Sequence, residues 1–184
     1  AEGLHTVAGG GLTTTLDLEG NLDELRMKLG LGTGLVVSAS VPPRAYFAAK
    51  NAEGTVPLMV AITAPKAPLP SILPSLRQID PYRFQGTLFS DLVANVNLHV
   101  KGEERSVESI DVRGSLRVDE GRVAIPDSTR ALDGVTFALR GQGASLVVEG
   151  LAAHEHDREK ANRSVSGSGK LSLDTRTVDL AIDA

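Results

Sequence analysis

The residues most able to do chemistry stand together in the stretch His154-Glu155-His156-Asp157. Alternate histidines on an extended segment can place two imidazoles on one side of a metal ion. The stretch also belongs to a charged run that reaches Arg163, and no further histidine lies nearby in the sequence. Such a run is typical of a solvated loop between strands, so the loop interpretation is favoured over a metal site.

Other motifs of catalysis or cofactor binding are missing from the sequence. It contains no nucleophile elbow, no phosphate-binding glycine loop and no dinucleotide fingerprint. His5 and His99 are isolated, and the carboxylates are too dispersed to identify an acid–base pair. We therefore expect a protein that is not an enzyme and that uses no cofactor and no metal.

Composition narrows the class of partner. The 184 residues carry a net charge of −4, without the basic patch that nucleic acid requires, so we expect no nucleic-acid partner. Aromatic residues make up 3% of the chain, too few for stacking on bases or sugars. No stretch reaches 18 consecutive apolar residues. There is no cysteine, and the chain begins at Ala1, as an excised piece or a processed chain would.

A short phrase recurs along the chain: an apolar residue, a spacer, an apolar residue, a charged residue and glycine. The two apolar positions lie two residues apart, so on a strand they point to one face, while the charged residue points to the other. The phrase predicts antiparallel sheet with one apolar and one wet face. Its five copies are LDLEG (16–20), LHVKG (98–102), IDVRG (110–114), FALRG (137–141) and LVVEG (146–150).

The same alternation runs through most of the chain. Strands are predicted over 12–22, 35–41 and 56–62, with Pro42-Pro43 and the turn residues 51–54 dividing the last two. From Leu92 onward the alternation is continuous, with a hairpin turn predicted at Glu120-Gly121. The sequence therefore predicts about a dozen strands in a mostly antiparallel all-β fold with at most one short helix.

Five prolines between Ala64 and Pro81 indicate a connector, in which a short helical turn around 72–79 is expected. This divides the chain into an N-terminal β segment (1–63), a proline-rich connector (64–85) and a C-terminal β segment (86–184).

The chain from Gly114 to Ala184 resembles the C-terminal region of the TamB family. These AsmA-like proteins are inner-membrane-anchored subunits of the bacterial translocation and assembly module. The resemblance lies in four segments: GSLRVDEGRVAIPD (114–127), LDGV (132–135), FALRGQGASLVVEGL (137–151) and SGSGKLSLD (166–174). Residues 86–115 and 16–29 look like more degenerate copies of the family's repeats. The family's membrane anchor and its aromatic-rich last strand are absent, so we expect an internal fragment.

The resemblance implies a β-taco, a twisted sheet curled into an open trough with an apolar concave face. It also implies a periplasmic lipid conduit that shields phospholipid acyl chains between the two membranes. The full-length protein would be anchored in the inner membrane and would meet an Omp85-type barrel through parts absent here. The positions expected to line the trough are Val96, Leu98, Val100, Ile110, Val112, Leu116, Val118, Val123, Ile125, Val135, Phe137, Leu139, Leu146, Val148, Leu171, Leu173, Val178, Leu180 and Ile182.

Two alternatives to a lipid conduit stay open at this point. The family has also been proposed to act as a chaperone-like scaffold for outer-membrane proteins and autotransporters, where the groove or a sheet edge would hold a nascent strand. A structural β-sandwich or closed barrel would use the same alternation to build a core. Alternation alone does not separate a core from a groove.

Overall fold

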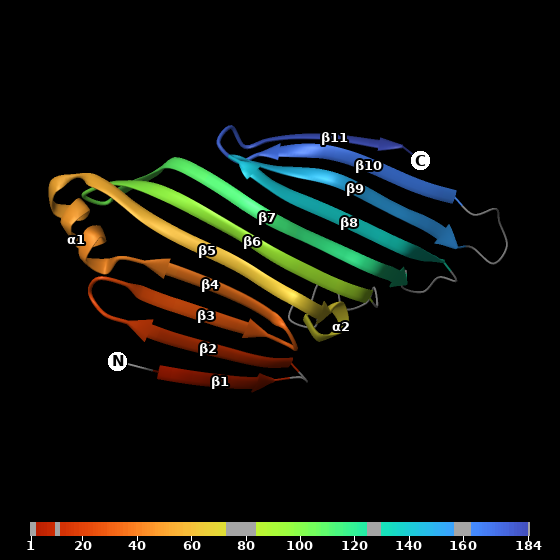
Figure 1. Ribbon diagram of the computed structural model, residues 1–184, viewed down its shortest axis with the longest axis horizontal. Helices are drawn as coiled ribbons and strands as arrows, with labels where there is room; N and C mark the ends of the chain where they lie inside the picture. Colours follow the sequence, from red (N-terminus) through yellow and green to blue (C-terminus); the bar gives the residue numbers. More distant parts are fainter. Residues whose placement is uncertain (1–2, 10–11, 73–83, 125–129, 157–162, 184) are drawn as a thin grey trace.

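The computed structural model describes residues 3–9, 12–72, 84–124, 130–156 and 163–183. Within these residues, eleven strands form one antiparallel sheet in which each strand pairs with the next along the chain (Figure 1). The strands are β1 (Gly3–Gly9), β2 (Leu12–Gly20), β3 (Leu25–Leu31), β4 (Leu35–Val41), β5 (Gly54–Pro68), β6 (Phe84–Lys101), β7 (Glu104–Ala124), β8 (Ala131–Gly143), β9 (Ser145–His156), β10 (Arg163–Ser172) and β11 (Thr177–Asp183). The predicted all-β antiparallel fold is confirmed.

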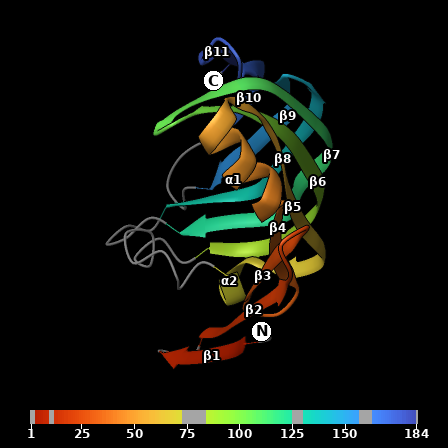
Figure 2. The same ribbon diagram turned by 90° about the vertical axis from the view of Figure 1, so that its left-hand side faces the viewer.

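The sheet is open at both sides. Its strand order begins at β1 and ends at β11, and it is neither closed nor strongly curled (Figures 1 and 2). Every described strand belongs to this one sheet, so the described residues contain no second sheet that could face it. A sandwich or closed barrel is therefore excluded for the described part of the chain.

Among the described residues, two helices interrupt the meander, one more than the sequence predicted. The helix α1 (Pro43–Ala52) joins β4 to β5, where only a break and a turn were expected. It begins with proline at its first position, where the missing N–H is not needed, and alanines make up much of the rest. It ends at Glu53, whose φ of 58° leaves the helical region. The prolines at 42 and 43 thus start a helix rather than only ending a strand.

The expected connector is partly strand. β5 continues through Pro65 to Pro68, past the expected boundary at residue 64, and α2 (Leu69–Ile72) follows it. Pairing with β6 shifts register between Ala64 and Ala67, so Pro65 lies in a bulge where it interrupts no ladder bond. The rest of the expected helical turn, 73–79, lies outside the described residues.

The hairpin predicted at Glu120-Gly121 is wrong. Both residues lie within β7, which runs without a break from Glu104 to Ala124. Glu120 has a φ of 54°, and the pairing with β8 shifts register on either side of Gly121. A bulge uses the same left-handed backbone conformation as a tight turn, so the dipeptide was compatible with both.

Candidate apolar binding face

The strand register gathers apolar residues on one face of the sheet. Along one line across the strands, Leu116 faces Leu139, Leu139 faces Val148, and Gly169 stands between Val148 and Leu180. The next line across the same strands consists of Leu88, Val118, Phe137, Leu151, Gly167 and Ile182. We call the face that carries these two lines the apolar face.

The opposite face carries charged side chains. The Nε atom of Arg113 lies 2.8 Å from Oδ2 of Asp111, and the Nε atom of Arg140 lies 2.8 Å from Oε1 of Glu149. All four side chains are 39% or more exposed, so these pairs are solvated. The wet side predicted from the charged position of the repeated phrase is therefore present.

Helix α1 covers the apolar face at the start of β5. Ala49 of the helix packs with Val56 and Val100, which are both fully buried. The cluster is completed by partly buried side chains that pack against it, those of Val41, Tyr46 and Leu98. This end of the face is a core that the chain covers itself.

Ion pairs fix α1 to the hairpin between β6 and β7. The Nζ atom of Lys50 lies 2.6 Å from Oε1 of Glu103, and Lys101 Nζ lies 2.8 Å from Oε2 of Glu53. The hydrogen bond from Lys101 lowers the pKa of Glu53, and the one from Lys50 lowers the pKa of Glu103. Both carboxylates are therefore held in their charged form, although solvent screens pairs as exposed as these.

Helix α2 covers the apolar face near the other end of β5. Ile72 packs on Leu35, Ala64, Ala67 and Leu88, all of them buried. Register places Val56, Ala64 and Ala67 on one face of β5, so the two helices lie on the same side of the sheet. Figure 2 shows both helices on that side.

This packing corrects part of the predicted lining. Val100 is fully buried beneath α1, and Val112 is 5% exposed, so neither side chain is free to contact a ligand. For Val100 the reason is that α1 was not foreseen, and the sheet under it was expected to be open. Ile125 lies outside the described residues. Half-buried positions away from the recess described below are Val96, Leu98, Ile110, Leu116, Val118, Val123, Val135 and Leu173.

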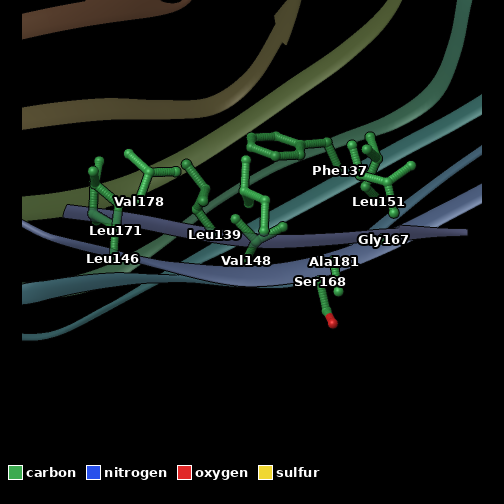
Figure 3. A pocket seen from close by; sticks show the side chains of 12 residues that line it. Phe137, Leu139, Leu146, Val148, Leu151, Gly167, Ser168, Leu171, Val178 and Ala181 are labelled. Carbon is green, nitrogen blue, oxygen red and sulfur yellow. The ribbon is translucent and has the colours of Figure 1, made fainter.

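The apolar face is open over β8 to β11. There it forms a recess of about 300 Å³. The recess is lined by Phe137, Leu139, Leu146, Val148, Leu151, Gly167, Ser168, Leu171, Val178, Leu180, Ala181 and Ile182. Figure 3 shows the Ser168 hydroxyl pointing to the side opposite the leucines and Phe137. Every side chain that points into the recess is therefore a hydrocarbon.

Glycines in β10 shape the floor of the recess. A Cβ atom at Gly167 would lie 3.7 Å from Cδ2 of Leu151 and 3.6 Å from Cγ1 of Ile182. A Cβ atom at Gly169 would lie 2.2 Å from the carbonyl oxygen of Asp179 and 2.6 Å from Cδ2 of Leu180. The bare backbone of β10 therefore lets the side chains of β9 and β11 close over it.

The outer wall of the recess faces solvent. The exposed fractions of Val178, Leu180 and Ile182 are 63%, 55% and 62%. Large apolar side chains scattered singly on a surface are ordinary, but these three adjoin an apolar recess. This combination makes the recess the candidate site for an apolar ligand.

Eight of the predicted lining residues meet in the recess: Phe137, Leu139, Leu146, Val148, Leu171, Val178, Leu180 and Ile182. Leu151 was missed, because a period of two places it on the face opposite Val148. In the structure, Glu149 is an extra residue in β9, so Leu139 faces Val148 while Phe137 faces Leu151. Gly167 and Gly169 were noted on the apolar side but not as lining, since they have no side chain. The glycine of the repeated phrase, Gly150, was the available signal for the bulge.

The histidines belong to a strand rather than to a loop. β9 extends to His156, and His154 faces Asp133 and Ser164 on the neighbouring strands. The imidazole of His154 is exposed and lies over Gly134, where a Cβ atom would be 3.3 Å from its Cδ2. The described residues contain no group of three His, Cys, Asp or Glu side chains placed to hold a metal ion.

A second recess, of about 470 Å³, lies against β4, β5 and β6. Its lining mixes apolar residues with Asp23, Glu24, Asn95 and Asn97. Both carboxylates have a cation partner: Asp23 lies 3.0 Å from Arg44, and Glu24 lies 2.7 Å from Arg26. The recess over β8 to β11 is therefore the better candidate site.

In the described part of the chain, no helix has the length and apolar character needed to cross a membrane. Comparison with protein-family models, with curated proteins and with solved structures gives no match to this chain.

Proposed function

We propose that the chain binds the acyl chains of lipids in the recess over β8 to β11, as one segment of a lipid conduit. The observation that carries this proposal is an open recess of about 300 Å³ whose inward-pointing side chains are all hydrocarbon. That volume is at the lower end of the range for small-molecule sites, about 300–1,000 Å³. It fits part of one acyl chain rather than a whole lipid.

The chemistry of the lining selects for hydrocarbon without selecting a headgroup. No polar or charged side chain points into the recess, so nothing there offers a directed hydrogen bond or an ion pair. Each methylene moved out of water contributes about 0.8 kcal/mol. A polar headgroup loses its hydration if it enters, so it stays in solvent.

Neighbouring positions on the apolar face are chemically alike. The two lines of aliphatic residues through Leu139 and Phe137 differ little in the surface they offer a methylene chain. An acyl chain that shifts along the face exchanges one set of such contacts for an almost equal set. Binding at equilibrium is thus compatible with movement along the sheet.

The resemblance to the TamB family supports a cellular location for this function. It suggests a periplasmic protein, anchored in the inner membrane through another part of the full-length chain. The lipids would then be phospholipids in transit between two membranes, with an Omp85-type barrel as the outer-membrane partner. The self-covered region under α1 and α2 would act as the stable base beside the open binding region.

Displacement of a fluorescent polyunsaturated fatty acid tests the proposal. Saturated fatty acids of increasing length compete for the site, and the affinity should rise by up to about fourfold for each added methylene until the recess is filled. Lysophospholipids with different headgroups and the same chain should compete equally. If the affinity of the competitors does not depend on chain length, or if it depends on the headgroup, the proposal is contradicted.

A matched pair of variants locates the binding. Val148→Asp places a carboxylate in the recess, whereas Val147→Asp places one on the opposite face between Arg140 and Lys170. We expect the first variant to lose fatty-acid binding and the second to keep it. An amphipathic strand peptide that displaces the fluorescent probe while free fatty acids do not would favour the chaperone-like scaffold instead.

A further inference from the structure

The recess ends at β8, where the apolar face changes from an open to a covered region. In the line across the strands that contains Phe137, its neighbour on the recess side is Leu151 of β9, and its neighbour on the other side is Val118 of β7. Val118 packs against the cluster under α2, to which the buried Leu88 opposite it in β6 belongs. Phe137 therefore stands between the recess and a core that the chain covers itself.

Phe137 differs in kind from the other residues that line the recess. It is the only Phe, Tyr or Trp residue in the chain after Phe89, and the rest of the lining is aliphatic apart from glycine and serine. A phenyl ring is large and flat, and it covers more surface than an aliphatic side chain does. Figure 3 shows the ring on the same side of the strands as Leu139 and Leu151. The ring is therefore suited to form a wall between two apolar regions.

The neighbouring positions of β8 complete this boundary. Leu139 occupies the next line across the strands, between Leu116 and Val148. In the line after that, β8 has Gly141, where a Cβ atom would lie 2.8 Å from Cγ1 of Val112. The side chain of Val112, which is buried, thus fills the space above the glycine. The largest of the three side chains along this boundary is that of Phe137.

The boundary also orients an acyl chain in the recess. Beyond β8 the apolar face continues into side chains that pack under α2, such as Val118 and the buried Leu88. A charged headgroup at that end loses its hydration without gaining a partner. The headgroup therefore stays away from β8, and the methyl end of the chain points toward Phe137.

We propose that Phe137 sets the longest acyl chain that the recess accepts. This inference rests on the proposed function, because it concerns what the same recess selects. Added methylenes strengthen binding only while they leave water, so the affinity stops rising once the chain meets the wall. Without the ring, the chain reaches Val118 on the next strand. That strand lies about 4.8 Å further on, the length of about four methylenes.

Truncation of Phe137 tests the proposal in the displacement assay with saturated fatty acids. We call the chain length at which the affinity stops rising the limiting length. Phe137→Ala should raise the limiting length by about four carbons, because the chain gains one strand spacing. Phe137→Leu keeps a branched apolar side chain, so it tests the proposal even if the alanine variant does not fold. It should raise the limiting length by less than Phe137→Ala does.

Leu171→Ala is the matched control. Leu171 lines the same recess, but it faces Leu146 on β9 and Val178 on β11, so its truncation opens no path toward α2. This variant should bind every chain length more weakly than the wild type and keep the limiting length unchanged. Circular dichroism establishes that each variant is folded before the affinities are compared.

Two results overturn this inference and leave the proposed function intact. The first is a limiting length that is the same in the wild type and in the folded Phe137 variants. The second is an equal rise in Leu171→Ala, because any added volume would then lengthen the accepted chain. A wild type that binds no fatty acid overturns the proposed function and this inference together, so the two failures are distinguishable.

Discussion

At the scale of single residues, glycines set how closely the strands of the binding region approach. Gly169 and Gly150 lie in neighbouring strands but have different surroundings. A Cβ atom at Gly169 would be 2.2 Å from the Asp179 carbonyl oxygen, whereas nothing lies within 4 Å of a Cβ atom at Gly150. A backbone oxygen in a paired strand has little freedom to move aside.

Alanine substitution at these two glycines should therefore have opposite effects. Gly169→Ala forces β10 and β11 apart and should lower the free energy of unfolding by about 1–3 kcal/mol. Gly150→Ala, the control, should leave it unchanged or raise it by a few tenths of a kcal/mol, about the gain from a less flexible unfolded chain. Urea denaturation monitored by circular dichroism measures both. Equal effects would show that the close approach at Gly169 is unimportant.

A second residue-scale feature links stability to pH. Oδ1 of Asp91 accepts two hydrogen bonds from Ser115, one from its backbone N–H at 2.6 Å and one from its hydroxyl at 2.8 Å. These bonds lower the pKa of Asp91, so they stabilise the fold above the ordinary aspartate pKa of about 4. The contribution is lost as the pH falls through the lowered pKa.

Asp91→Asn should therefore destabilise the chain at neutral pH, and the difference from the wild type should shrink as the pH falls below about 4. Urea denaturation at a series of pH values measures this. Asp183→Asn is a control, because Asp183 lies on the exposed edge strand and its pairing partner is Ser166. A difference that stays constant from neutral to acid pH would contradict the assigned role of the Asp91 carboxylate.

At the scale of elements, α1 divides the apolar face into a packed and an open region. Val100 lies beneath the helix and is fully buried, whereas Val178 is 63% exposed at the recess. Both are strand valines at apolar positions, so the sequence pattern does not distinguish them. Only the position of the helix does.

Truncation of the two valines should separate stability from binding. Val100→Ala leaves a cavity under α1 and should cost about 2 kcal/mol of unfolding free energy without changing fatty-acid affinity. Val178→Ala should change stability little and weaken the binding of fatty acids. Thermal denaturation and probe displacement on the same samples give both values. If Val100→Ala is fully folded and still binds fatty acids more weakly than the wild type, the division of the apolar face into a packed and an open region is contradicted.

The elements also show what sequence could predict. Strict alternation from Leu92 onward identified the strands, because a half-buried sheet requires period two. The bulges at Glu120 and Glu149 were not predicted, since a single extra residue leaves the local pattern almost unchanged. The helix α1 was missed because the prolines at 42 and 43 were interpreted only as strand breakers.

At the scale of the whole molecule, a one-layer sheet leaves an apolar face that the described residues cover only in part. The helices α1 and α2 account for the region around β4 to β7. The region over β8 to β11 has no such cover among the described residues, and it holds the recess. The alternation of apolar and polar residues predicted the apolar face itself. Which part of the face is covered depends on the positions of the two helices and on the pairing register of the strands.

Native mass spectrometry of the chain incubated with phospholipid shows directly whether the recess holds an acyl chain. We expect a discrete lipid-bound mass for the wild type, its loss in Val148→Asp and its retention in Val147→Asp, with unchanged β circular dichroism in both variants. A wild type that stays free of lipid, or two variants that bind lipid equally well, would contradict the assignment of the recess as an acyl-chain site.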